Sequence, residues 1–390
     1  MKFLRDFNLN DKKVLVRVDF NVPLWLGENE SIDNEEDWRI EATLPTINYL
    51  LEQKAKIILI AHFGRPNGKI VENLRLNLVK KRLEKLLGLS VIKLDNCLGS
   101  EVETRIENMR TGEIILLENI RFYPEERANN QDFAKKLAIL GEIYVNDAFG
   151  VSHRNHASIT GLPKYLPSCA GLLFEKEIKF LSKVLEKTEH PLVVVIGGAK
   201  ISTKIKFIEN FLEKADNLLL AGALANTVIS AKGFAIGKSV TEAGMDEEIK
   251  KLNLTSSKLH IPVDVLASKD VSGNANIRIS PVGNIDKHEM ILDIGPDTIQ
   301  TFSRIISEAK MIVWNGPLGL LEVEKFSLGS REIAQAIAKN NNFSIVGGGD
   351  TVAFLEKLGL LNKITHVSTG GGAMLKFLAG EKLPGIEALN

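Results

Sequence analysis

Short apolar runs alternate with amphipathic stretches along most of the chain. Brief runs of β-branched and other apolar residues are typical of buried strands, and apolar residues that recur once per helical turn are typical of helices covering a sheet. The first series of strands and helices is predicted over Val14–Val18, Ala42–Gln53, Ile57–Ile60, Leu78–Leu87, Ile114–Leu117, Phe133–Leu140 and Ile143–Val145. This alternation predicts βαβ units and a parallel sheet.

A second series follows the lysine-rich helical segment Phe174–Lys187. Its elements are predicted over Val193–Ile196, Ile201–Lys214, Leu218–Leu220, Ile312–Trp314, Arg331–Ala338, Ser344–Val346 and Thr351–Leu358. The region Ser230–Ile291 has no clear pattern. Because 390 residues exceed one ordinary hydrophobic core, we predict two α/β domains that are joined near residues 170–190.

Composition and charge exclude several classes of protein. The chain carries 49 basic and 49 acidic side chains, so no overall field favours nucleic acid or an anionic membrane. The longest apolar runs are far shorter than the ~20 residues that a bilayer requires. The first residues form no secretory signal, and Cys97 and Cys169 lack metal-ligand spacing. We therefore expect a cytoplasmic protein without nucleic-acid or membrane partners.

Glycine-rich turns follow several predicted strands of the second half. They lie at Gly197–Lys200, Asn315–Pro317, Gly347–Asp350 and Ser368–Gly372. In open α/β sheets, ligands bind outside the carboxyl ends of the strands, and glycine lets a backbone approach phosphate oxygens. A lone turn of this kind is explained equally well by tight strand-to-helix packing. Their recurrence in one half favours a nucleotide site.

Two lysines strengthen this interpretation. Lys200 and Lys204 are predicted to lie one turn apart at the start of the helix that begins near Ile201. Cations at a helix amino terminus oppose the helix dipole, so a polyphosphate between them would explain their position. The alternative is a solvated lysine pair without a ligand.

Asp350 stands where a P-loop has its lysine, directly after three glycines. One interpretation makes Asp350 the N-cap of the helix that begins at Thr351. The other makes it a ligand of Mg²⁺, which accepts one or two protein carboxylates and completes its shell with phosphate oxygens.

The first half has a different chemistry at its predicted strand ends. These ends carry Arg17, His62, Arg65, Arg121, His153, Arg154 and His156, and Arg39 lies near the start of a helix. Because strand ends of a parallel sheet converge, these side chains predict one basic basin suited to phosphate and carboxylate groups. Any single arginine could instead be a surface or ion-pair residue.

The histidines leave further alternatives open. A phosphohistidine relay through His62, His153 or His156 is conceivable, but direct transfer between a nucleotide and an anionic acceptor needs no covalent intermediate. Metal binding by His153 and His156 lacks a third ligand nearby in the sequence.

The motifs together resemble phosphoglycerate kinase, in order and over essentially the whole chain. They are Arg17–Pro23, His62–Pro66, Leu117–Phe122, Asn146–Gly150, Gly197–Lys200, Asn315–Pro317, Gly347–Thr351 and Ser368–Gly372. The resemblance implies a phosphotransferase with a carboxyl acceptor, which moves a phosphoryl group reversibly from 1,3-bisphosphoglycerate to ADP in glycolysis. It also implies a monomer and direct in-line transfer after hinge closure.

The resemblance implies two Rossmann-like domains that are joined by a hinge helix. The amino-terminal domain, residues 1–172, would bind phosphoglycerate, with residues 373–390 packing back on it. The interdomain helix would span residues 173–188. The carboxyl-terminal domain, residues 189–372, would bind the nucleotide.

Matching motifs also imply the site residues. Phosphoglycerate would be held by Asp19, Asn21, Arg39, His62, Arg65, Arg121 and Arg154, with Arg17 and His153 adding to the basic patch. The nucleotide would be held or flanked by Lys200, Lys204, Glu322, Asp350, Thr351 and the amides of Gly348, Gly349, Gly371 and Gly372. The adenosine pocket would be lined by Gly197, Gly198, Gly222, Gly295 and Pro317. Asp350 would hold Mg²⁺, and the catalytic set would be Arg39, Lys200, Lys204 and Gly371.

The chain departs from the family pattern in three places. They are Ala221–Leu224, where the family often has Gly-Gly-Met, Phe63, where leucine is usual, and the loop Trp25–Ser31, which is long. Two rival functions remain at this stage: another acyl-phosphate kinase, and a two-lobed binding protein without chemistry. The first would need fewer arginines, and the second would not need Lys204 and Asp350.

Overall fold

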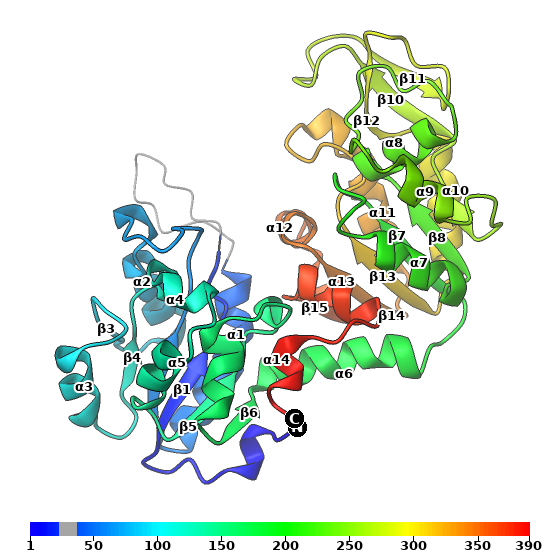
Figure 1. Cartoon of the computed structure of the whole chain (residues 1–390). Helices are drawn as coiled ribbons and strands as arrows, with labels where there is room; N and C mark the ends of the chain where they lie inside the picture. Colours follow the sequence, from blue (N-terminus) through cyan, green and yellow to red (C-terminus); the bar gives the residue numbers. More distant parts are fainter. Residues whose placement is uncertain (23–36) are drawn as a thin grey trace. The chain divides into compact units, whose positions relative to one another are not determined.

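The computed structural model describes residues 1–22 and 37–390 and divides into two compact units (Figure 1). The first unit comprises Met1–Lys179 and Lys382–Asn390, and the second comprises Phe180–Glu381. The boundary falls within α6, Leu172–Glu186. The predicted loop Trp25–Ser31 lies outside the described residues.

The end of the chain returns to the first unit later than we expected. The predicted returning segment began at residue 373, but α13, Gly372–Leu378, belongs to the second unit. There Asn210 Nδ2 donates to the Leu378 carbonyl over 2.6 Å. From Lys382 onward the chain contacts the first unit, where the Gly385 amide donates to the Ser152 carbonyl over 2.8 Å.

The first unit is built on a parallel sheet of order β3-β4-β2-β1-β5-β6. Its strands are β1 Lys13–Arg17, β2 Lys56–Ile60, β3 Ile92–Lys93, β4 Ile114–Leu116, β5 Ile143–Asn146 and β6 Ser168–Ala170. Its helices include α1 Trp38–Glu52, α2 Asn77–Leu87, α3 Ser100–Glu107, α4 Pro124–Arg127, α5 Gln131–Ala138 and α14 Pro384–Glu387. The central strands are buried on both faces, as their continuous apolar runs predict.

The second unit contains a parallel sheet of order β15-β14-β13-β7-β8-β9. Its strands are β7 Leu192–Ile196, β8 Asn217–Leu220, β9 Leu259–His260, β13 Met311–Asn315, β14 Phe343–Gly347 and β15 His366–Ser368. Helices of this unit are α7 Ile205–Lys214, α8 Gly222–Ala231, α9 Asp246–Lys251, α10 Pro296–Glu308, α11 Leu328–Lys339, α12 Gly349–Lys357 and α13. Two mainly parallel, helix-covered sheets confirm the predicted fold class.

The region without a clear sequence pattern contains a small antiparallel sheet of order β11-β10-β12. Its strands are β10 Asp264–Ser268, β11 Ile277–Pro281 and β12 Met290–Ile294. Strand β11 is about half-exposed and mixes polar with apolar residues, so it lacks the apolar run that marks a buried strand. Among the described helices, none is long and apolar enough to cross a membrane.

Candidate active site

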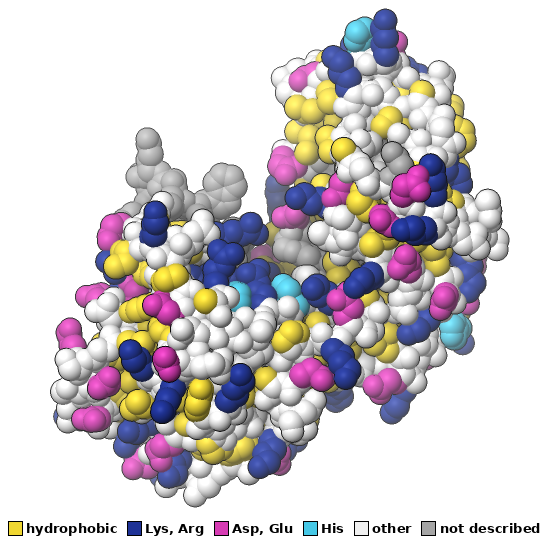
Figure 2. Space-filling model, viewed as in Figure 1, with side chains coloured by type: hydrophobic (Ala, Val, Ile, Leu, Met, Phe, Trp, Pro, Cys, Tyr) yellow, Lys and Arg dark blue, Asp and Glu magenta, His cyan; other side chains and the backbone are white. Residues whose placement is uncertain are grey.

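Most of the predicted basic residues lie at one end of the first unit's sheet. Arg17 ends β1, and His62 and Arg65 follow β2. Arg121 lies in the short 3-10 helix Ile120–Phe122 after β4, and Arg154 follows the 3-10 helix Phe149–Val151 after β5. Because these strands are parallel, their carboxyl ends share one edge. Figure 2 shows Lys and Arg side chains gathered over this unit with histidine beside them.

The pKa shifts of His62 and Arg154 show which guanidinium groups surround them. The pKa of the buried His62 lies well below its usual value because of burial and then because of the guanidinium groups of Arg17, Arg121, Arg154 and Arg39. Burial is also the main reason for the lowered pKa of Arg154, to which Arg65 contributes. We refer to Arg17, Arg39, His62, Arg65, Arg121 and Arg154 as the basic cluster.

Asp19 is a carboxylate inside the basic cluster. Its Oδ2 accepts a hydrogen bond from Arg39 Nη1 over 2.9 Å, and its Oδ1 lies 3.8 Å from His62 Nε2. Asn21 supports the neighbouring loop, since its Oδ1 accepts from the Gly64 amide over 2.8 Å. Both residues therefore hold parts of the cluster in place through contacts within the protein.

Arg121 has a buried donor that none of the described residues uses. Its Nη1 donates to the Gly64 carbonyl over 2.8 Å, but its buried Nη2 finds no hydrogen-bond partner among the residues that the structure describes. Burial, followed by the charges of Arg154 and Arg17, lowers the pKa of Arg121 to about 9, so it stays cationic at neutral pH. A buried charged donor without a partner costs on the order of 1–3 kcal/mol or more, which an anionic ligand would recover.

The other two histidines lie in or beside the turn that follows β5. His153 is half-buried, and His156 is buried with its Nδ1 3.6 Å from Glu126 Oε1. Burial and then the nearby Arg17 lower the pKa of His156 to about 3. The two histidines do not share a helix face, because residues 153–156 form no helix. In the described parts of the chain, no group of three or more His, Cys, Asp or Glu residues could hold a metal ion.

The glycine turns of the second unit contact one another. The Gly198 amide donates to the Pro317 carbonyl over 2.7 Å, and the Gly222 amide donates to the Leu318 carbonyl over 3.1 Å. A Cβ at Gly197 would lie 2.0 Å from the Pro317 carbonyl oxygen. The turns after β7, β8 and β13 thus pack backbone against backbone, and only glycine fits at Gly197.

The turn after β14 joins the same assembly but differs from one prediction. Thr351 Oγ1 accepts from the Gly316 amide over 3.1 Å. Helix α12 begins at Gly349, and its N-cap is Gly348, whose φ of 103° suits glycine. The interpretation of Asp350 as the N-cap is therefore wrong. Asp350 is an exposed residue of the first helical turn, where the helix dipole favours a carboxylate.

The lysines are also placed differently from the prediction. Residues 201–204 form turns, and α7 begins at Ile205, so Lys200 and Lys204 do not share its first turns. The Ser202 amide donates to Glu242 Oε2 over 2.9 Å, and the Lys204 amide donates to the Ile201 carbonyl over 2.8 Å within these turns. Lys200 is exposed, whereas Lys204 is 9 % exposed.

Lys204 reaches into the glycine turns. Its Nζ donates to the Gly197 carbonyl over 2.5 Å, and a Cβ at Gly316 would lie 2.6 Å from that Nζ. Burial lowers the pKa of Lys204 to about 8, and the charge of Asp350 opposes this shift. A cation and a carboxylate therefore stand beside backbone turns that can approach a phosphate chain.

Three predicted nucleotide residues lie at other places in this unit. Gly295 follows β12 and caps α10, and a Cβ there would lie 2.3 Å from the Asp264 carboxylate, so packing alone explains this glycine. Glu322 is exposed in the segment after β13. Gly371 is the N-cap of α13 with a φ of 44°.

Comparisons with known proteins agree with this geometry. The family model described as "Phosphoglycerate kinase" matches residues 4–381. The phosphoglycerate kinase of Dictyoglomus turgidum is 48% identical over 99% of this chain and 97% of its own length, and that of Moorella thermoacetica is 47% identical over 99% and 98%. The chain belongs to the phosphoglycerate kinase family.

Solved structures support the same assignment. The phosphoglycerate kinase from Coxiella burnetii has a TM-score of 0.83 and 39% identity. The phosphoglycerate kinase from Pyrococcus horikoshii OT3 has a TM-score of 0.88 and 34% identity. Each match covers 100% of this chain and 98% of the other.

Family membership establishes the reaction. The phosphoglycerate kinase reaction is reversible phosphoryl transfer from 1,3-bisphosphoglycerate to ADP, which gives 3-phosphoglycerate and ATP in glycolysis. The enzyme is a phosphotransferase with a carboxyl group as acceptor. This assignment decides against both rival functions, the other acyl-phosphate kinase and the binding protein without chemistry.

Sequence reasoning missed the residues that brace the basic cluster of this phosphoglycerate kinase family member. Asn119 Oδ1 accepts from the amides of Phe63 and Arg121 over 3.2 and 3.1 Å, which ties the loop after β2 to that after β4. Asn119 lies within the matched motif Leu117–Phe122, and this position could have identified it as a residue of the site. Ser158, which bonds to Arg17, and Glu126, which bonds to Ser158, gave no signal because these residues are far apart in the sequence.

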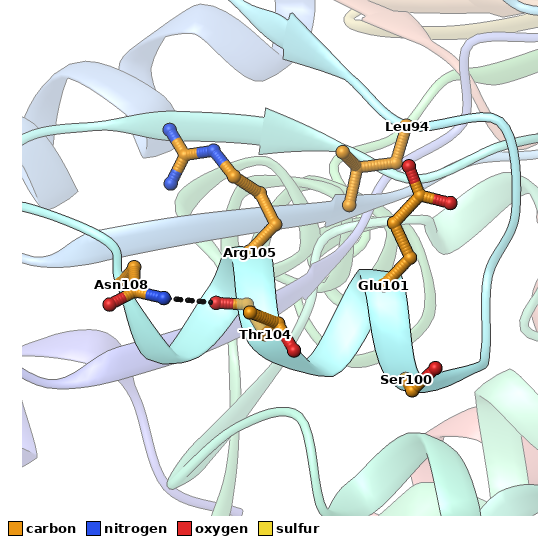
Figure 3. Close-up of a pocket in the computed structure, with 6 residues that line it drawn as sticks. All are labelled: Leu94, Ser100, Glu101, Thr104, Arg105 and Asn108. Atoms are coloured by element: carbon orange, nitrogen blue, oxygen red, sulfur yellow. Dashed lines mark hydrogen bonds between the residues drawn. The ribbon is translucent and has the colours of Figure 1, made fainter.

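A surface pocket lies apart from these residues, along α3 of the first unit (Figure 3). It is lined by Leu94, Ser100, Glu101, Thr104, Arg105 and Asn108. Arg105 Nη2 lies 3.1 Å from Glu113 Oε2, and Asn108 Nδ2 donates to the Thr104 carbonyl over 2.8 Å. The phosphoglycerate kinase motifs contribute none of its lining, so we assign it no part in the reaction.

Proposed function

We propose that the two units divide the substrates of the reaction. The basic cluster of the first unit binds the phosphoglycerate, and the glycine turns of the second unit bind ADP or ATP. The single observation that carries the proposal is the buried Nη2 of Arg121, which has no hydrogen-bond partner in residues 1–22 and 37–390, because a desolvated cationic donor calls for an anion.

The phosphoglycerate site draws on the chemistry of that substrate, which carries a phosphate at one end and a carboxyl group at the other. Arg65, Arg121 and Arg154 supply planar, bidentate donors for these groups. His62 and the half-buried His153 add donors, while Asp19 and Asn21 act by holding Arg39 and the loop at Gly64. The lowered pKa of Arg154, due first to burial, is consistent with a site that an anion stabilises.

The nucleotide site uses backbone amides as well as cations. The amides of Gly348, Gly349, Gly371 and Gly372 lie at the starts of α12 and α13, where helix dipoles favour phosphate oxygens. Lys204 and Lys200 supply positive charge, and Thr351 braces the turn after β14 against the one after β13. The adenosine is proposed to lie beside the packed turns, against Gly197, Gly198, Gly222, Gly295 and Pro317, with Glu322 at the ribose or phosphate side.

Asp350 is proposed to hold Mg²⁺. Its exposed carboxylate in the first turn of α12 suits this metal, which keeps several waters and phosphate oxygens and needs one or two protein ligands. The lack of a three-residue ligand cluster among the described residues is consistent with a metal held mainly by the nucleotide. Bound there, Mg²⁺ would neutralise part of the phosphate charge.

Direct in-line transfer then needs positioning and charge rather than a base. The transition state spreads negative charge over the equatorial oxygens of the moving phosphoryl group. Arg39 from the first unit, Lys204 and Lys200 from the second, and the Gly371 amide are proposed to surround these oxygens. Since the substrates bind to separate units, hinge closure must bring the two sites together during turnover and exclude water.

We further propose that the enzyme acts as a monomer in the cytoplasm. Every residue of the proposed sites comes from one chain, so a second copy is not needed to complete them. A glycolytic reaction with small soluble substrates is consistent with that compartment.

A coupled assay tests the proposed function. Purified protein with Mg²⁺ is expected to form ATP from ADP and 1,3-bisphosphoglycerate, and to form far less from ADP and acetyl phosphate, which lacks the second phosphate that the arginines recognise. No ATP from 1,3-bisphosphoglycerate at saturating Mg²⁺ would overturn the proposal. Equal rates with both donors would remove the role given to the basic cluster.

A further inference from the structure

A buried chain of hydrogen bonds lies beneath the basic cluster. Glu126, on α4, is fully buried, and its two carboxylate oxygens accept from the Ser158 amide over 2.8 Å and from the Ser158 hydroxyl over 2.6 Å. The same hydroxyl oxygen accepts from Arg17 Nε over 2.9 Å. Because a hydroxyl has one proton, Ser158 gives it to Glu126 and keeps its lone pairs for Arg17. The chain therefore has a fixed direction.

Arg17 connects this chain to His62. The guanidinium is 0 % exposed, and its Nη1 donates to the carbonyls of Val18 and Ile60. Its Nη2 lies 3.1 Å from His62 Nδ1. These contacts use donors from all three guanidinium nitrogens within the protein, so Arg17 lies behind the cluster rather than at its ligand-binding surface.

The chemistry of arginine determines the protonation of His62. A guanidinium has only donors, so the Nδ1 facing it must offer a lone pair. With its proton on Nε2, the neutral ring then has a donor 3.8 Å from Asp19 Oδ1. The cations that face the ring are Arg17, Arg121, Arg154 and Arg39, and the carboxylate of Asp19 lies on the other side. The four positive charges disfavour a second proton on His62, which would make the ring a fifth cation.

We propose that Glu126 and Ser158 are positioning residues, which hold Arg17 so that Arg17 fixes His62 as a neutral ring with its proton on Nε2. This inference rests on the proposed function, since it assigns His62 the role of a neutral N–H donor to the phosphoglycerate. It also argues against a phosphohistidine relay through His62, because Arg17 uses the Nδ1 lone pair and the proton occupies Nε2. Neither nitrogen can attack phosphorus in that state.

Glu126 supplies the charge that a buried Arg17 requires. Burial raises the pKa of Glu126, while Arg17, the Ser158 hydrogen bonds and Arg121 oppose that shift, and His156 Nδ1 lies 3.6 Å from its Oε1. An uncompensated buried guanidinium would be costly, and the Ser158 hydroxyl that accepts from Arg17 would lose its ionised partner. Removing the carboxylate charge is therefore expected to disturb Arg17, and His62 with it, although neither Glu126 nor Ser158 touches the substrate.

Nitrogen NMR of the whole enzyme, selectively labelled with ¹⁵N in its seven histidines, tests the proposal directly. The His62→Gln variant identifies the His62 signals. We expect an unprotonated Nδ1 and a protonated Nε2, without titration between about pH 6 and 8. A proton on Nδ1, or a cationic ring at neutral pH, would overturn the proposal. This measurement needs no substrate, so it can be made even if the ATP assay fails. Failure of the tautomer proposal is therefore distinguishable from failure of the proposed function.

Variants separate positioning from a merely structural role. Ser158→Ala is expected to give mixed His62 tautomers and to raise the KM for 3-phosphoglycerate roughly tenfold, with kcat changed less than about threefold. Ser158→Thr keeps the hydroxyl and is expected to restore both. Ser168→Ala is the matched control, because the hydroxyl of Ser168, at the start of β6, donates to the Leu166 carbonyl and not to the chain that holds Arg17. Wild-type tautomer and KM in Ser158→Ala would contradict the assignment.

A second pair of variants covers the case in which Ser158→Ala does not fold. Glu126→Gln keeps the shape and removes the charge, and we expect the same tautomer mixture and the same rise in KM. The control is Glu142→Gln. In the wild type, the Glu142 carboxylate binds Lys12 and the Lys13 amide at the opposite end of β1. An unchanged His62 spectrum in Glu126→Gln would overturn the role of Glu126.

Discussion

The ammonium group of Lys204 donates a hydrogen bond to the carbonyl of Gly197, which fixes a nearly buried cation at the meeting point of the turns after β7 and β13. The protein thus keeps a desolvated charge beside the proposed phosphate site. Its burial has consequences for both activity and stability.

Replacing Lys204 is expected to separate these two properties. Lys204→Met should lower kcat about 10²- to 10³-fold, because a charge next to the transferring group is lost. The variant should be no less stable than wild type and up to ~2 kcal/mol more stable, since a buried charge is removed. Steady-state rates and urea unfolding check both values. A strongly destabilised Lys204→Met would show that the lysine is structural.

The same lysine predicts a pH dependence. In the folded protein its pKa is about 8, below the ordinary value of 10.5, so the unfolded chain binds more protons between these values. This group therefore lowers stability below pH 8 and the penalty disappears as the pH rises through that window. Activity should change in the opposite direction, with kcat/KM for ADP falling above about pH 8. A flat pH profile up to pH 10 would contradict a catalytic cation at Lys204.

Arg39 and Asp19 are expected to differ in their kinetic effects. Arg39→Ala should lower kcat by about 10²-fold or more, because its charge is proposed to act in the transition state. Asp19→Asn keeps the side-chain shape but weakens the contact that aims Arg39, so it should raise the KM for 3-phosphoglycerate about tenfold. Asp11→Asn, which contacts Lys56 over 3.0 Å, is the control and should behave as wild type. Full turnover by Arg39→Ala would remove its assigned role.

Asp350 should act through the metal. Asp350→Asn is expected to raise the Mg²⁺ concentration for half-maximal activity about 10- to 100-fold, without changing affinity for 3-phosphoglycerate. Asp297→Asn is a matched control, because that residue is also an exposed carboxylate in the first turn of a helix. If the two variants showed equal Mg²⁺ dependence, Asp350 would not be a metal ligand, and its only role would be to interact favourably with the dipole of α12.

Gly316 should tolerate no side chain. Its φ is +93°, and a Cβ would lie 2.4 Å from the Gly197 carbonyl oxygen and 2.6 Å from Lys204 Nζ. Gly316→Ala is expected to cost roughly 3 kcal/mol or more, from strain plus displacement of both groups. Gly233→Ala has a similar φ of +85° in open space, and should cost only about 1 kcal/mol. Urea unfolding of both variants, followed in the second unit, measures the difference.

The sequence predicted what depends on local pattern. Continuous apolar runs such as Leu192–Ile196 located the parallel strands, and their ends located the arginines and glycine turns. Antiparallel strand β11 was not found because it is half-exposed and mixes polar with apolar residues. The start of α7 was placed too early: residues 201–204 form turns, in which the Ser202 amide and hydroxyl bind Glu242, 40 positions away. Such long-range contacts leave no local trace.

The same limit explains the errors within the site. Asp350 looked like an N-cap because a carboxylate is favoured at that position, yet α12 begins at Gly349. The support of Arg17 by Ser158 spans 141 positions and involves a residue outside every motif that we recognised. Residue types and strand ends predicted which side chains gather, whereas the hydrogen bonds that orient them required coordinates.

Calorimetric titration of the whole enzyme with each substrate separately tests the division of substrates between the two units most directly. Arg121→Gln is expected to weaken 3-phosphoglycerate binding at least about tenfold and to leave ADP binding within about twofold of wild type. Lys204→Met is expected to do the reverse. A loss of both affinities in either variant, or wild-type 3-phosphoglycerate binding by Arg121→Gln, would contradict the account.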